Sequence, residues 1–78
     1  MKIYMVHGKY TPLTFVKAMS KQEAMDIYYE KCITYKPIAL NKCIYKVEQV
    51  KNLKQTLKKI ETDVSFVNYK GYTTEEDF

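Results

Sequence analysis

The sequence predicts a small single domain of the α+β class, with the approximate element order β-β-α-β-α-β. Three observations support this prediction. The 78-residue chain has room for one hydrophobic core. Short segments rich in β-forming residues, most of them alternating in hydropathy, predict strands, and two other segments repeat apolar residues at helical spacing behind a capping residue. We expect an antiparallel or mixed sheet with both helices packed on one face.

The first two strands are predicted at residues 2–7 and 13–19. Residues 2–7 alternate in side-chain character, and residues 13–19 are rich in β-forming side chains. The break between them, Gly8 to Pro12, is longer than a tight two-residue turn. We therefore predict a hairpin with an open loop that presents Tyr10.

The first helix is predicted to begin at Ser20, because Ser20 and Glu23 form a capping-box pattern. Its broad apolar face consists of Ala24, Met25, Tyr28, Tyr29 and Cys32. An acidic stripe lies opposite and consists of Glu23, Asp26 and Glu30. Proline lacks an amide hydrogen and restricts the residue before it, so Lys36-Pro37 excludes a longer helix.

A third strand and a second helix follow. Cys43, Tyr45 and Val47 alternate with polar residues, which predicts a half-buried strand with these three side chains on its apolar face. Asn52 is a plausible N-cap for a helix over residues 53–61. The apolar side of that helix consists of Leu53, Leu57 and Ile60, and the opposite stripe of Lys51, Lys54 and Lys58.

The C-terminal part is predicted to contain one more strand, residues 64–69, followed by a turn at Lys70-Gly71. Residues 1–72 are assigned to the domain. Residues 73–78 carry three acids and are predicted to form a flexible tail.

Little in the sequence points to catalysis. His7 is the one histidine, and no serine or cysteine lies near it in sequence to form a nucleophile pair. Both glycines are isolated, so no glycine-rich loop can hold a phosphate. Cys32 and Cys43 lack the spacing of a metal site, and Cys32 is interpreted as a buried structural residue. We expect a protein that is not an enzyme and has no cofactor or metal.

The sequence also lacks features of secreted and membrane proteins. Two cysteines are too few for a disulfide framework. The apolar run at residues 3–6 is too short for a signal-peptide core or a membrane span. We expect a soluble, cytoplasmic protein without membrane contacts.

Charge and tyrosine content give the candidate binding residues. From residue 31 to 59 there are eight lysines and a single acid, and the chain has no arginine to read bases. A solvated helix face is the alternative interpretation of these lysines. Tyr28, Tyr29 and Tyr45 are predicted to lie in the core, whereas tyrosines near loops suit protein interfaces or base stacking. The candidate partner-binding residues are Lys46, Lys51, Lys54, Lys58, Tyr10, Tyr35, Tyr69 and Tyr72.

Two hypotheses for function follow. The first is a small protein-binding module that inhibits or regulates a larger protein or complex. In size and composition the chain is similar to accessory proteins of phages and mobile elements, anti-CRISPR and other anti-defence inhibitors among them, although no motif is shared. The alternative is nucleic-acid binding without sequence specificity through the lysines. We also predict a homo-oligomer in which the acidic stripe meets the basic stripe of another copy.

Overall fold

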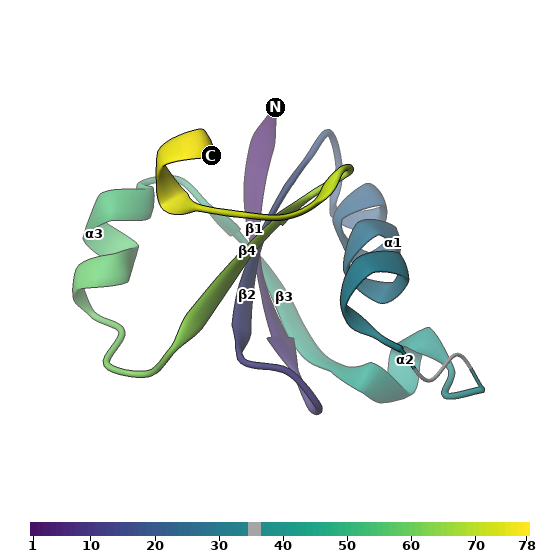
Figure 1. Cartoon of the computed structure of the whole chain (residues 1–78). Coiled ribbons are helices and arrows are strands. Elements are labelled where there is room, and N and C mark those ends of the chain that lie inside the picture. Colours follow the sequence, from purple (N-terminus) through teal and green to yellow (C-terminus); the bar gives the residue numbers. More distant parts are fainter. Residues whose placement is uncertain (35–36) are drawn as a thin grey trace.

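A computed structural model describes residues 1–34 and 37–78 (Figure 1). It confirms the α+β class, with a five-stranded mixed sheet in the order β3-β1-β2-β4-β5. The elements are β1 (Lys2–Gly8), β2 (Leu13–Ala18), α1 (Lys21–Cys32), α2 (Leu40–Cys43), β3 (Ile44–Val50), α3 (Leu53–Lys58), β4 (Val64–Asn68), β5 (Gly71–Thr73) and the 3-10 helix η1 (Glu75–Asp77). The observed order differs slightly from the predicted one, because α2, β5 and η1 are added to it.

The sheet combines antiparallel and parallel pairs. The predicted hairpin of β1 and β2 is confirmed, and β3 and β5 also pair antiparallel with their neighbours. β2 and β4 pair in parallel. Because β3 and β4 consequently run in the same direction, their connection must cross the sheet, and it contains α3.

The two main helices lie beside opposite faces of the sheet, whereas the sequence predicted both on one face (Figure 1). Tyr4 and Val16 pair across β1 and β2 and pack in one core with residues of α1. Met5, on the other face of β1, lines a cavity together with residues of α3. The β3–β4 crossover, which contains α3, passes over the face that α1 leaves open. We call these faces the α1 side and the α3 side.

The capping interactions of α1 agree with the sequence prediction. The Ser20 hydroxyl accepts a hydrogen bond from the Glu23 amide at 3.1 Å. The Glu23 carboxylate reaches back and accepts from the Met19 amide at 3.0 Å, one residue before the expected cap amide. The helix then buries Ala24, Ile27 and Tyr28 against the sheet.

The β1–β2 hairpin is fixed to the core by one tyrosine hydroxyl. Tyr28 is fully buried, and its hydroxyl hydrogen-bonds to the Thr11 hydroxyl at 2.8 Å. Burial raises the pKa of Tyr28. A Cβ atom at Gly8 would collide with this hydroxyl, so the close approach requires glycine at that position.

The prediction that Tyr45 lies in the core was wrong. Tyr45 is 74% exposed, the highest value among the large apolar side chains recorded as exposed. The register between β1 and β3 shifts between His7 and Gly8, which breaks the alternation at the start of β3. Cys43 is buried as expected but lies in α2 rather than in the strand.

The C-terminal segment packs against the α3 side. The Phe78 ring meets Phe66 edge-on, with 5.2 Å between ring centroids. The Lys17 ammonium donates a hydrogen bond to the Phe78 carbonyl oxygen. The division into a domain of residues 1–72 and a flexible tail stays a prediction.

Within the described residues, no helix is long and apolar enough to cross a membrane.

Candidate functional site

The helix α3 leaves its apolar side chains partly open. Asn52 caps the helix as predicted, because its side-chain oxygen accepts from the Gln55 amide at 3.1 Å. The helix ends at Lys58, earlier than the predicted residue 61. None of its six residues is buried. The two leucines of the helix, Leu53 and Leu57, are half-buried. Ile60, two residues after the end of the helix, is half-buried as well.

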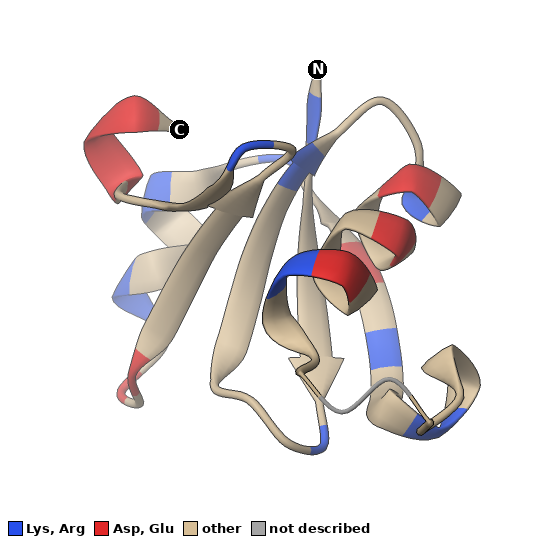
Figure 2. Cartoon of the chain, turned by 45° about the vertical axis from the view of Figure 1, so that its right-hand side comes forward, with Lys and Arg blue, Asp and Glu red and all other residues tan. Residues whose placement is uncertain are grey.

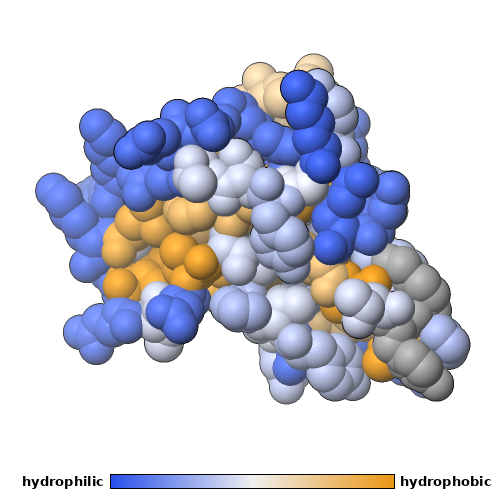
Figure 3. All heavy atoms as spheres, in the orientation of Figure 1, coloured by the Kyte–Doolittle hydropathy of each residue, from blue (hydrophilic) through white to orange (hydrophobic). Residues whose placement is uncertain are grey.

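The sheet adds further apolar residues on the same side. Leu13 pairs with Val64, and Phe15 pairs with Phe66 and stacks on it at 5.5 Å between ring centroids. Phe15 is fully buried, whereas the other three are half-buried. Figure 3 shows apolar side chains gathered in the region of α3 and β4, with hydrophilic side chains around them. We define the apolar surface as Leu13, Leu53, Leu57, Ile60, Val64 and Phe66.

Lysines border this apolar surface. Lys54 and Lys58 are exposed and lie one helical turn apart on α3. Lys51 precedes the helix cap, and Lys59 follows the last residue of the helix. Figure 2 shows lysines along α3 and acids along α1, on opposite sides of the sheet. Of the predicted basic stripe, Lys54 and Lys58 lie on one face of α3, and Lys51 lies before the helix.

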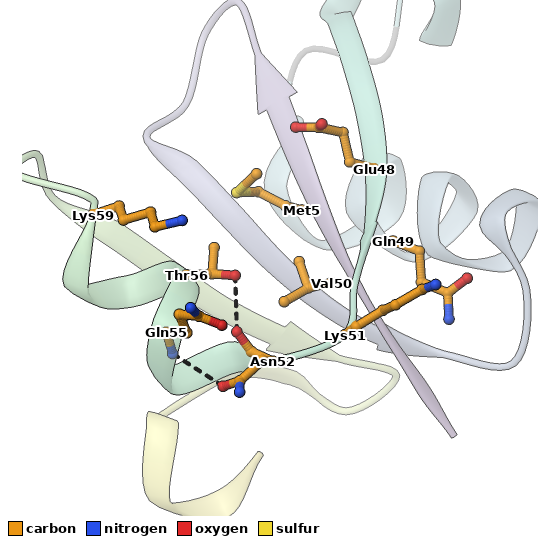
Figure 4. A pocket seen from close by; sticks show the side chains of 9 residues that line it. All are labelled: Met5, Glu48, Gln49, Val50, Lys51, Asn52, Gln55, Thr56 and Lys59. Carbon is orange, nitrogen blue, oxygen red and sulfur yellow. Dashed lines mark hydrogen bonds between the residues drawn. The ribbon is translucent and has the colours of Figure 1, made fainter.

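An open cavity of about 340 Å³ lies between α3 and the sheet (Figure 4). Met5 from the sheet faces Thr56 and Lys59 across it. Lys51 also contributes to its lining. The Glu48 carboxylate lines it as well, so the cavity presents side chains of both charge signs.

The acidic C-terminal segment approaches the other side of α3. Lys54 lines a second open cavity, of about 660 Å³, together with Thr74, Glu75 and Glu76. Carboxylates near Lys54 reduce the local positive potential that a phosphate would meet.

Lys46 lies apart from the other candidate lysines. Lys51 is five positions farther along the chain, roughly 17 Å away if that chain is extended. The Lys46 ammonium nitrogen is 3.2 Å from Glu48 Oε1, and Glu48 Oε2 is 2.9 Å from His7 Nε2. The hydrogen bonds from His7 and Lys46 lower the pKa of Glu48. The structure thus places Lys54 and Lys58 one turn apart on α3, with Lys51 just before the helix and Lys46 farther along β3.

The candidate tyrosines do not form one cluster. Tyr69 and Tyr72 are exposed at the β4–β5 turn, where the Asn68 side-chain oxygen accepts from the Lys70 amide at 2.8 Å. The φ angle of +125° at Gly71 explains why the predicted turn needs glycine. Tyr10 is exposed in the β1–β2 loop, at the other end of β2 and β4. Tyr35 lies outside the described residues.

Tyr72 is fixed to α1 in spite of its exposed ring. A hydrogen bond with Cys32, assisted by burial, raises the pKa of Tyr72 to about 12. Cys32 is half-buried and packs against the core, whereas the sequence predicted a buried structural residue. In the part of the chain that the structure describes, neither Cys32 nor Cys43 is in a disulfide. Among the described residues, no group of three His, Cys, Asp or Glu side chains could hold a metal ion.

Sequence reasoning missed the contribution of the sheet to the apolar surface. One signal was available, because β2 has apolar residues on both faces: Leu13 and Phe15 on one, Val16 and Ala18 on the other. A strand that is apolar on both faces needs cover on both. Comparison with known proteins adds no relative, because no family model, curated protein or solved structure matches the chain.

Proposed function

We propose that this protein is a small non-enzymatic binding module that inhibits or regulates a larger protein by covering part of its surface. The observation that carries the proposal is the half-buried apolar surface on the α3 side, with Lys51, Lys54 and Lys58 beside it. Protein interfaces commonly have an apolar centre and a polar rim. The lysines favour a partner with an acidic rim.

The α1 side supports the same proposal by contrast. There the core is closed, and Tyr4, Val6, Val16 and Val67 are buried beneath α1. A partner could gain little further apolar burial at that face. The likeness in size and composition to phage accessory proteins directs the search for a partner to host defence complexes.

Nucleic-acid binding is the second candidate function. It is favoured by Lys54 and Lys58, whose exposed side chains lie one turn apart next to Lys51 and Lys59. Lysines at this spacing can follow a phosphate backbone without reading bases. Such binding loses affinity steeply as the salt concentration rises.

Two single substitutions distinguish these functions. Leu57→Ser removes an apolar contact and leaves the charge unchanged, whereas Lys58→Glu reverses one charge. Binding to a protein through the α3 side requires both wild-type residues, so each variant should lose the partner. Binding to nucleic acid requires only the lysine, so Leu57→Ser should still shift mixed DNA and RNA in a gel. Lys70→Glu, at the β4–β5 turn, is the matched control for the charge change.

The experiment captures partners from the host lysate with tagged wild type and with each variant, and then repeats binding with the purified partner. Circular dichroism checks that each variant folds. Loss of the partner with Leu57→Ser and Lys58→Glu, but not with Lys70→Glu, supports the proposal. Repeated recovery of the bait alone, or a nucleic-acid shift that falls with salt and ignores Leu57→Ser, contradicts it.

A further inference from the structure

The strand β3 lies at an edge of the sheet and has one partner strand. Within the described residues it pairs only with β1, and this pairing is regular from Lys46 to Val50, beyond the register shift at His7 and Gly8. Alternate backbone N–H and C=O groups of such a strand point away from the sheet and can pair with another strand. The opposite edge differs, because β5 has only three residues. The long open edge is therefore β3.

The charges on β3 are arranged symmetrically for antiparallel pairing with a second copy of the same strand. Val47 is flanked by Lys46 and Glu48. If two copies pair about a twofold axis at Val47, Lys46 of each copy lies opposite Glu48 of the other. Opposite charges at directly facing positions stabilise a strand pair.

Other registers with the same faces aligned are disfavoured. A shift by two residues in one direction places Lys46 opposite Lys46 of the second copy, and a shift in the other direction places Glu48 opposite Glu48. Like charges at facing positions destabilise a strand pair. The lysine of an edge strand often prevents association, but here the neighbouring glutamate provides its complement. Lys46 and Glu48 together therefore favour the register centred on Val47 and do not prevent β3–β3 pairing.

The side chains of this edge are accessible. Lys46, Tyr45 and Gln49 are exposed, and Glu48 and Val47 are half-buried. Lys46 and Glu48 face the same side as their β1 partners His7 and Met5. Each Glu48 already contacts His7 at 2.9 Å and Lys46 at 3.2 Å. Pairing of two β3 strands would add Lys46 of the second copy to these contacts of Glu48, so no unpaired charge would be buried.

We propose that two copies of this chain associate through antiparallel β3–β3 pairing centred on Val47, which joins their sheets into one. This interface is separate from the apolar surface and does not rest on the proposed function. It also differs from the predicted contact between acidic and basic helix stripes. It assigns to Lys46 a role other than phosphate binding.

Charge reversal and charge exchange test the proposal. Sedimentation equilibrium should detect a dimer of the wild type in low salt at micromolar to submillimolar concentration. Glu48→Lys and Lys46→Glu should each raise the dissociation constant of the dimer by about tenfold or more, because two facing pairs change from attraction to repulsion. The double variant Lys46→Glu/Glu48→Lys should restore the dimer, since the opposite charges again face each other.

Lys58→Glu is the control, because it makes the same charge change on α3 and should leave the dimer intact. Thermal unfolding of each variant checks the fold. Hydrogen exchange should show protection of β3 amides that rises with protein concentration. A wild-type monomer throughout the concentration range overturns the proposal. So does a dimer that the charge exchange fails to restore, or one that Lys58→Glu dissociates, which would indicate the helix stripes instead.

Discussion

The two sides of the sheet differ in how completely they are covered. On the α1 side, a helix of twelve residues lies over the sheet and contributes fully buried residues such as Ala24 and Tyr28. On the α3 side, a helix of six residues contributes no buried residue. Phe15 is buried there largely among aromatic neighbours, with Phe66 stacked on it and Phe78 against Phe66. The α1 side is thus a closed hydrophobic core, whereas the α3 side leaves apolar side chains partly exposed to solvent.

This difference separates stability from binding. Burial of apolar surface is the main favourable contribution to folding, and most of it lies on the α1 side. The α3 side gives up part of that contribution and retains apolar area that a partner can cover. A chain of this size can therefore keep a stable scaffold beneath one helix and a binding surface beside the other.

The largest expected effect contrasts one apolar residue from each helix. Ile27→Ala on α1 should lower the free energy of unfolding by about 2–5 kcal/mol, because Ile27 is buried in the core. Leu57→Ala on α3 should lower it by only about 1 kcal/mol, because Leu57 is half-buried. Urea unfolding of both variants measures the contrast. Equal losses would show that the α3 side is as closed as the α1 side.

A smaller effect is expected from Gly8→Ala on the α1 side. The new methyl group would collide with the Tyr28 hydroxyl, which should cost about 1–3 kcal/mol of unfolding free energy. In the background of Tyr28→Phe, which lacks that hydroxyl, the same substitution should cost less. Urea unfolding of the wild type, the two single variants and the double variant gives the coupling free energy between Gly8→Ala and Tyr28→Phe. Identical costs in both backgrounds would rule out this collision.

The smallest expected effect is a pH dependence at the edge of the α1 side. The pKa of Tyr72 is raised to about 12 from the usual value near 10, so the folded state favours the neutral hydroxyl. Its contribution to stability is fully present below pH about 10 and is lost as the pH rises towards about 12. Tyr72→Phe should therefore destabilise the protein at about pH 8, and the difference from wild type should shrink by about pH 11.5. A difference that stays constant with pH would contradict this role.

Local sequence signals predicted most of the fold. The caps Ser20 and Asn52 form the expected hydrogen bonds, because a side-chain oxygen and a nearby helix amide are local in sequence. The four expected strands and the turn at Lys70-Gly71 also occur. The exposure of Tyr45 was not predictable in this way, because it depends on a register shift between two strands far apart in the chain.

The candidate site was only partly predictable. Lys54 and Lys58 follow from one helical stripe and were identified. Lys46 was predicted to join them, but it lies in β3, whose direction carries it away from α3. The apolar surface joins β2, α3 and β4, which extend from Leu13 to Asn68 of the chain. It results from the crossover of α3 to the face that α1 leaves open, and helical or strand periodicity does not specify that choice.

The most direct test of the account compares two matched double variants in partner capture from the host lysate, quantified by mass spectrometry. Lys54→Glu/Lys58→Glu reverses two exposed charges one turn apart on α3, and Asp26→Lys/Glu30→Lys does the same on α1. We predict that the α3 variant loses the partner and that the α1 variant keeps it. Loss of the partner with the α1 variant alone, or its retention by both, would contradict the assignment of binding to the α3 side.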